Sequence, residues 1–245
     1  MKLAAAIFFT FFVLCLTVPA RAGIVYFNDF SSTPGAEWSS TSTRASNGES
    51  YLASTSGYGF GNGTVTLTLT GLTVGASATI DFDLYVIGSW DGNGVPGNNP
   101  SYPDWARPDN WGVTVNGITQ IYTNFVHYTY NGQTQAYPSM LAPLGSGGSN
   151  PARTGATATD HLGYGTGYYG DTTYHFSIPV GNLTSSTLTV AFTSYQTEGY
   201  SNEGWGLDNV KVTSSVPTPI PASLLLFAPG LLGLATFRRR FDKRR

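Results

Sequence analysis

Cysteine, histidine and charged residues are scarce in this sequence. Its 245 residues include one cysteine, three histidines and twelve lysines and arginines, and charged residues make up 11% of the chain. The single cysteine, Cys15, lies in an apolar N-terminal segment, so the chain that follows has no thiol for a disulfide or a nucleophile. The fold must therefore be stabilised by packing or by a bound metal ion.

Recognisable catalytic motifs are absent as well. The sequence has no G-x-S-x-G elbow, no H-E-x-x-H motif and no close pair of glutamates on one strand, since Glu198 and Glu203 flank a loop segment. The histidines His127, His161 and His175 are dispersed along the chain. Because no set of catalytic groups converges in the sequence, we expect a protein that is not an enzyme.

Positive charge is sparse in the central part of the chain. Between residues 23 and 216 four basic residues stand against thirteen carboxylates, a net charge of −9, whereas residues 217–245 have a net charge of +5. Four scattered cations cannot neutralise a phosphate backbone, so nucleic acid is excluded as a partner. Acidic exported domains more often hold divalent cations.

The N-terminus has the pattern of a secretory signal peptide over residues 1–22. Lys2 precedes an apolar run over residues 3–18, and Ala20-Arg21-Ala22 forms an A-x-A cleavage site. We therefore expect a signal helix that directs the chain to the Sec translocon, and a mature N-terminus at Gly23.

The C-terminal segment, residues 215–245, combines an uncharged run with a basic cluster. Residues 222–237 contain no charge and would form a helix about 24 Å long. A bilayer core is about 30 Å thick, so flanking residues are needed to span it, and we expect a transmembrane helix over about residues 220–237. The basic cluster, residues 238–245, would hold the C-terminus in the cytoplasm.

A proline-punctuated stretch precedes the apolar run, and arginines follow it: the residues are Val216, Pro217, Pro219, Pro221, Arg238, Arg239 and Arg240. This order of features resembles a PEP-CTERM sorting signal, although Ile220 stands where that family has glutamate. The resemblance implies an exported protein of a Gram-negative bacterium that an exosortase, a membrane protease, processes after export across the inner membrane. It would then be on the cell surface or secreted, and otherwise a single-pass membrane protein.

Alternating apolar residues predict β-strands between these two segments. In residues 64–70 and 78–86 every second residue is apolar, and three further stretches near residues 172–212 show the same period. The stretch 111–122 predicts a hairpin with Asn116-Gly117 as a type I′ turn.

Together these strands predict an all-β fold for residues 23–214. About eight strands in a domain of this size are typical of a two-sheet β-sandwich of the jelly-roll or lectin kind, with its first and last strands close together. Two long loops, 89–110 and 136–169, interrupt the strands, and loops of that length are often functional. In strand content the domain resembles jelly-roll carbohydrate-binding modules and lectins. The stretches at residues 82–94, 108–117 and 204–212 also resemble a pattern of exported bacterial β-sandwich proteins, many of which have such tails.

Two sets of oxygen ligands are candidate sites for a structural calcium ion. The resemblance to carbohydrate-binding modules implies a calcium site that joins the first strand to the last, which here corresponds to Asn28, Asp29 and Asp208. The alternative is that these side chains bond nearby backbone groups. The second set is Asp91 and Asn93 with Asp109 or Asp104, in a loop that lacks the spacing of an EF-hand.

Tryptophans and tyrosines are the candidate sugar-binding residues. Trp111 and Trp205 each precede an alternating strand and are expected in the core, and Trp90 is expected to pack against the sandwich. Tyr102 and Trp105 lie in a polar loop and are candidates for an exposed platform that stacks on sugar rings.

Three functions follow from these features. The first is a non-catalytic protein of the cell surface or extracellular matrix, sorted through its tail and associated with exopolysaccharide or biofilm. The second is a carbohydrate-binding, lectin-like module. The third is a glycan-active hydrolase, which would require a pocket in which carboxylates converge.

Overall fold

The computed structural model describes residues 21–94, 107–128, 132–141, 147–196 and 198–216. Residues from Ala22 to Ser215 form one compact unit. Several predicted features lie outside the described residues. They are the signal helix up to residue 20, the predicted transmembrane helix, the sorting residues beyond Val216, and the loop residues Tyr102, Asp104 and Trp105. Among the described residues no helix has the length and apolar character needed to cross a membrane.

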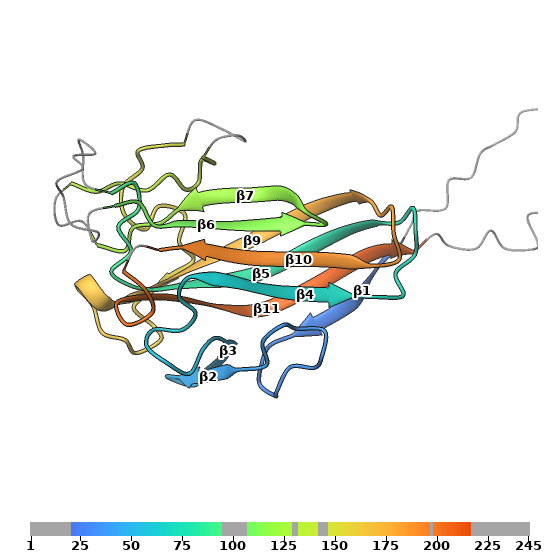
Figure 1. Cartoon of the computed structure of the whole chain (residues 1–245), viewed down its shortest axis with the longest axis horizontal. Coiled ribbons are helices and arrows are strands. Elements are labelled where there is room, and N and C mark those ends of the chain that lie inside the picture. The colour runs from blue at the N-terminus through green and yellow to red at the C-terminus, as the bar shows by residue number, and fades with distance from the viewer. Residues whose placement is uncertain (1–20, 95–106, 129–131, 142–146, 197, 217–245) are drawn as a thin grey trace, which may run out of the picture. The chain divides into compact units, whose positions relative to one another are not determined.

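The described residues form two sheets (Figure 1). In spatial order, the seven-stranded sheet contains β2 (Thr43–Ser46), β3 (Glu49–Leu52), β11 (Glu203–Val216), β5 (Ser77–Gly88), β9 (Asp171–Asn182) and β8 (Ala158–Thr159), with β1 (Arg21–Asn28) also paired to β11. The four-stranded sheet contains β4 (Gly63–Leu69), β10 (Leu188–Tyr195), β6 (Asn110–Val115) and β7 (Ile118–Asn124). Strands β2 to β11 pair antiparallel. The predicted all-β class is confirmed, and the first strand lies beside the last.

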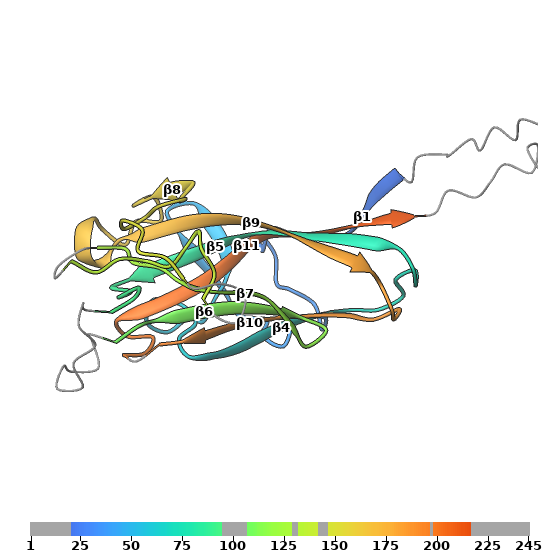
Figure 2. The same cartoon turned by 90° about the horizontal axis from the view of Figure 1, so that it is seen from above.

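The sheets pack face to face over one apolar core, as seen from above in Figure 2. Because side chains alternate across a strand, every second residue of β5 points into this core. Ile80, Phe82 and Leu84 are all fully buried, as the sequence pattern predicted. Phe82 also contacts Phe192 of the opposite sheet, with 5.1 Å between ring centroids. This burial is the main source of stability for a chain with little charge.

The expected hairpin joins β6 to β7. Asn116 and Gly117 both have positive φ angles, 49° and 80°, as a type I′ turn requires. The turn prediction is therefore confirmed, and its twist matches that of the two paired strands.

Part of the outer face of the large sheet is covered by a second cluster of buried residues. Tyr51 and Tyr85 pack edge to face there with ring centroids 5.0 Å apart, and Leu162 lies against them. Gly206 of β11 makes room for this cluster, since a Cβ atom at that position would lie 2.5 Å from Cδ2 of Tyr51. Trp205 points the other way, into the main core.

Candidate functional site

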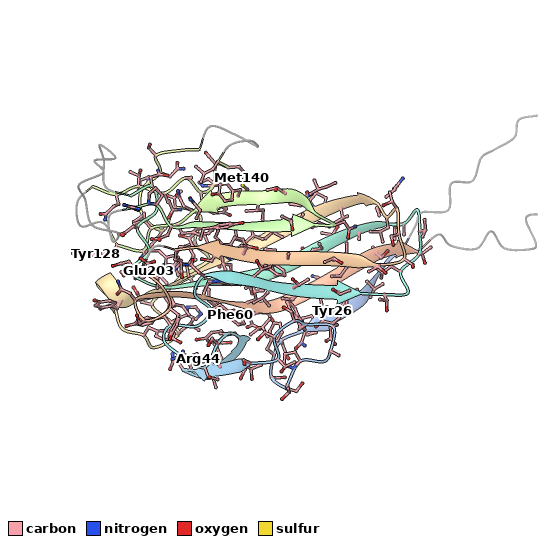
Figure 3. All side chains as sticks on the ribbon, viewed as in Figure 1. Tyr26, Arg44, Phe60, Tyr128, Met140 and Glu203 are labelled. Carbon is pink, nitrogen blue, oxygen red and sulfur yellow. The ribbon has the colours of Figure 1, made fainter. Side chains whose placement is uncertain are left out.

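The loops at one end of the sandwich gather the acidic residues of four chain segments. At this end β5 and β10 finish while β6 and β11 begin. Figure 3 labels Glu203 there, at the start of β11. Chain segments that are far apart in the sequence meet because antiparallel pairing brings the end of one strand to the start of its neighbour.

Three carboxylates converge at this end. One oxygen from each of Asp91, Glu198 and Glu203 lies within 4.8 Å of the other two. Asp109 adjoins them, since its Oδ2 atom accepts a hydrogen bond of 2.8 Å from the backbone N–H of Asp91. We call these four residues the carboxylate cluster.

The carboxylate cluster is largely shielded from water. Glu203 and Asp109 are fully buried, Asp91 is 5% exposed and Glu198 is partly exposed. Neither oxygen of Glu203, nor Oδ2 of Asp91, accepts a hydrogen bond from an N–H or O–H group of the described residues. Gln133 donates a bond of 3.1 Å to the other oxygen of Asp91. Three buried oxygens of the cluster therefore lack a hydrogen-bond donor among the described residues, and a proton or a cation would compensate them.

Burial and mutual repulsion both favour protonation when no cation is bound. Burial, followed by the charges of Asp109 and Glu198, raises the pKa of Asp91 to about 8. Burial, followed by the charges of Asp109 and Asp91, raises the pKa of Glu203 far above its usual range.

Tight turns and indole contacts hold the cluster in place. Gly92 follows Asp91 with a φ of 57°, and a Cβ atom there would collide with the carbonyl oxygen of Thr134. Trp90, fully packed as predicted, donates from Nε1 to the carbonyl oxygen of Gly204 at 2.9 Å. These contacts fix Asp91 beside the start of β11.

The second predicted metal set is brought together only in part. Asp91 and Asp109 meet, but the ligand atom of Asn93 is engaged elsewhere, because its Oδ1 accepts a hydrogen bond of 3.0 Å from Nδ2 of Asn124. Its Nδ2 donates to Thr134 Oγ1 at 3.0 Å and to the carbonyl of Gly148 at 2.7 Å. Sequence reasoning did not place Glu198 or Glu203 at a metal site. Their spacing around a loop was visible, but nothing in it indicated which distant carboxylates they would approach.

The first predicted calcium site, at Asn28, Asp29 and Asp208, shows hydrogen bonds to nearby groups. Among the described residues, no hydrogen bond joins Asp29 to Asp208. The Oδ1 atoms of Asn28 and Asp29 accept from the backbone N–H groups of Phe30 and Ser31, at 2.7 and 3.1 Å. Asp208 is buried on the outer face and accepts from the Tyr85 hydroxyl at 3.0 Å. These bonds are of the kind expected if the side chains serve the backbone, and the calcium link between Asp29 and Asp208 stays a prediction.

A separate open cleft of about 340 Å³ lies along the start of β4 and is lined in part by Tyr200 and Trp205. Its lining combines hydroxyl and amide groups with aromatic rings, including Ser39, Ser40, Ser54, Asn62, Thr64 and Tyr200. Tyr200 is 55% exposed and lies on the β10–β11 loop, two residues after Glu198. Its carbonyl oxygen accepts a hydrogen bond of 2.8 Å from the backbone N–H of Tyr58, which ties the loop to the wall of the cleft.

A further cluster of polar side chains surrounds His127, and its members bond to one another. Its Nε2 atom lies 2.7 Å from a guanidinium nitrogen of Arg153, and its Nδ1 lies 2.7 Å from the hydroxyl of Thr172. Arg153 also forms an ion pair of 2.9 Å with Asp160. Burial, and then the Arg153 charge, lowers the pKa of His127 to about 4, so the ring is neutral at pH 7.

No protein-family model matches this chain, and no curated protein matches it. Among solved structures it is similar to a family 35 carbohydrate-binding module from an environmental isolate, with 11% sequence identity and a TM-score of 0.25, over 83% of this chain and 96% of that chain. A likeness this weak has no bearing on the ligand.

Proposed function

We propose that this chain is a non-catalytic, exported cell-surface protein whose β-sandwich binds polysaccharide in the cleft beside Tyr200. The observation that supports binding is the composition of the cleft. Hydroxyl and amide groups line it together with a tyrosine ring that is 55% exposed. Sites for small ligands are concave and combine apolar or aromatic surface with a few placed polar groups.

The chemistry of a sugar ring suits this lining. A pyranose has an apolar face that packs on an aromatic ring and hydroxyl groups around its edge that need hydrogen-bond partners. Tyr200 would supply the ring surface, while Ser40, Ser54 and Asn62 would supply polar contacts at the walls. The cleft is open at the surface, so a sugar would enter it directly from solvent.

Export and sorting complete the proposal. The signal peptide would bring the domain across the inner membrane, and the PEP-CTERM-like tail would deliver it to an exosortase and then to the exopolysaccharide layer. A polysaccharide-binding domain would retain the protein there. We expect its strands to have the jelly-roll connectivity of the lectins that it resembles in strand content.

The decisive experiment measures binding of the full chain, kept in mild detergent, to a panel of exopolysaccharides. Tyr200→Ala should weaken binding about fivefold, because one stacking contact contributes about 1 kcal/mol. Tyr200→Phe keeps the ring and should retain most of the affinity. Tyr195→Ala is the matched control, since Tyr195 is also 55% exposed but does not line the cleft.

Equal loss of binding in Tyr200→Ala and Tyr195→Ala would contradict a role for the cleft. The same panel tests the platform predicted at Tyr102 and Trp105, through Trp105→Ala. Loss of binding in Trp105→Ala alone would move the sugar site from the cleft to that loop.

A further inference from the structure

We propose that Asp91, Glu198 and Glu203 of the carboxylate cluster bind one calcium ion, with Asp109 adding to the negative charge of the site. This site is separate from the cleft and does not depend on sugar binding. The two proposals can therefore succeed or fail independently.

The spacing of the three side chains suits one ion. One oxygen from each lies within 4.8 Å of the others. Oxygen ligands bind Ca²⁺ at about 2.3–2.6 Å, so ligands on opposite sides of the ion are about 5 Å apart. An ion between Asp91, Glu198 and Glu203 would therefore reach all of them with the backbone as it stands.

The unpaired buried oxygens are the observation that separates this cluster from an ordinary acidic surface. Glu203 is fully buried, and neither of its oxygens has a hydrogen-bond donor among the described residues. Oδ2 of Asp91, a residue that is 5% exposed, also has no donor there. An ionised carboxylate in such a place is strongly destabilising unless a cation or donors compensate it. Because these oxygens lie within the cluster, one ion would compensate several of them at once.

The ligand atoms select the class of ion. All of them are carboxylate oxygens, which suit hard cations such as Ca²⁺ and Mg²⁺ more than the softer transition metals. Calcium takes about six to eight oxygens in irregular geometries, whereas magnesium demands a near-ideal octahedron and gives up its water reluctantly. A buried group of side chains drawn from separate loops and strands is the irregular kind of site, and partly exposed Glu198 leaves room for water ligands.

Converging carboxylates are also what a glycan hydrolase requires, so burial decides between the two functions. A catalytic acid or base must come within hydrogen-bond reach of the glycosidic oxygen. Glu203 and Asp109 are fully buried and Asp91 is 5% exposed, so a sugar chain cannot reach them. A single metal ion is small enough to reach these carboxylates.

An ion at this place would fasten both sheets at their loop end. Asp91 follows β5 and Glu203 begins β11 in the large sheet, whereas Glu198 follows β10 and Asp109 precedes β6 in the small sheet. Cross-linking these segments would stabilise the folded state only, since the unfolded chain does not hold the ligands together.

Terbium luminescence is the direct test, because Tb³⁺ occupies calcium sites and is excited by nearby indoles. Trp90 precedes Asp91 in the chain and Trp205 is two residues beyond Glu203. The full chain, in mild detergent and stripped with a chelator, should show indole-sensitised Tb³⁺ emission that calcium displaces. Glu198→Gln and Glu203→Gln should each lose most of this emission, and Asp208→Asn should keep it.

Thermal melting supplies a second readout. Calcium at a hundredfold excess over Kd should raise the melting temperature of the full chain by roughly 5 to 10 °C. The rise should vanish in Glu198→Gln, which is the variant least prone to misfold because Glu198 is partly exposed. Magnesium at equal concentration should give a smaller rise.

Three results would overturn the proposal. The first is a melting temperature that is equal in chelator and in about 10 mM calcium, which exceeds the Kd of weak extracellular sites. The second is a calcium effect that survives Glu198→Gln and Glu203→Gln but is lost in Asp208→Asn, which would place the ion between the first and last strands. The third is polysaccharide cleavage that depends on Glu203 in a chain that binds no ion, which would make the cluster catalytic.

Discussion

The carboxylate of Asp109 accepts a hydrogen bond of 2.8 Å from the backbone N–H of Asp91, eighteen residues earlier in the chain. Both residues are buried, and both carry a carboxyl group. One backbone bond thus holds two groups of like charge together where little water reaches them. Such an arrangement costs stability unless a proton or a cation is shared, which is why we expect the loop end of the sandwich to respond to calcium.

Calcium should strengthen polysaccharide binding as well as folding. Glu198 and Tyr200 lie two residues apart on the β10–β11 loop, so an ion held by Glu198 would restrict the loop that presents the tyrosine ring. With a coupling at the low end of the usual range, the affinity should be about fivefold higher in calcium than in chelator. Glu198→Gln should remove this difference. Equal affinity in both conditions, with terbium emission intact, would show that the two sites are independent.

Acid should destabilise the fold through His127. Its pKa falls from 6.5 to about 4 on folding, chiefly because of burial and next because of Arg153. The unfolded chain therefore binds this proton more tightly than the folded chain. The stability that the neutral ring provides is complete above pH 6.5 and is lost as the pH falls toward 4.

The loss amounts to about 3 kcal/mol in unfolding free energy across this interval. Urea unfolding of the full chain and of His127→Gln from pH 4 to pH 7 measures it as the difference between the two profiles, because the raised pKa values of Asp91, Glu203 and Asp208 act in the opposite direction and are present in both. The stability of His127→Gln relative to the parent chain should rise as the pH falls from 6.5 to 4, whereas His175→Gln, at a side chain 51% exposed, should follow the parent profile. A profile that both variants share with the parent chain would rule out His127 as the responsible group.

Gly206 should tolerate no side chain. A Cβ atom there would lie 2.5 Å from Cδ2 of fully buried Tyr51, so Gly206→Ala should destabilise the fold by about 1–3 kcal/mol through overpacking. Gly181→Ala is the matched control in a strand of the same sheet, because a Cβ atom there meets nothing within 4 Å. Chemical denaturation gives both values, and equal stability of the two variants would mean that Tyr51 moves aside freely.

The tail should be absent from the exported protein. If the tail is processed as its resemblance to a PEP-CTERM signal implies, we expect the chain to be cut between residues 219 and 222, so that the mature protein lacks the basic cluster at 238–245. Mass spectrometry of the C-terminal peptide, in cells that possess an exosortase, checks this directly. Mature protein that still carries Arg238 to Arg245 would refute processing at this site.

Local features of the fold could be predicted because their causes are local. Alternation of apolar and polar residues along 78–86 follows from the period of a strand, and the buried side chains of Ile80 and Phe82 agree with it. The positive φ angles at Asn116 and Gly117 follow from the steric freedom of these residue types. Burial of Trp90, Trp111 and Trp205 was likewise foreseeable from their size and the strands beside them.

The candidate site was predicted only in part, because its members are distant in the sequence. Asp91 and Asp109 belong to one loop region, and their proximity was foreseen. Glu198 and Glu203 join them through the pairing of β11 with β5, in which Glu203 stands opposite Gly88. A shift of one residue in that register would turn Glu203 to the other face, and no feature of the loop sequence sets the register.

The sequence by itself therefore determined the strands, their inward faces and the tight turn, since these depend on side-chain periodicity and on backbone sterics over a few residues. Only the tertiary structure decided which carboxylates meet and that Tyr200 lines a cleft. Both depend on which strands are neighbours and in which register, and that is settled by the packing of the whole core, where a contact such as that of Trp90 with Gly204 joins residues 114 positions apart.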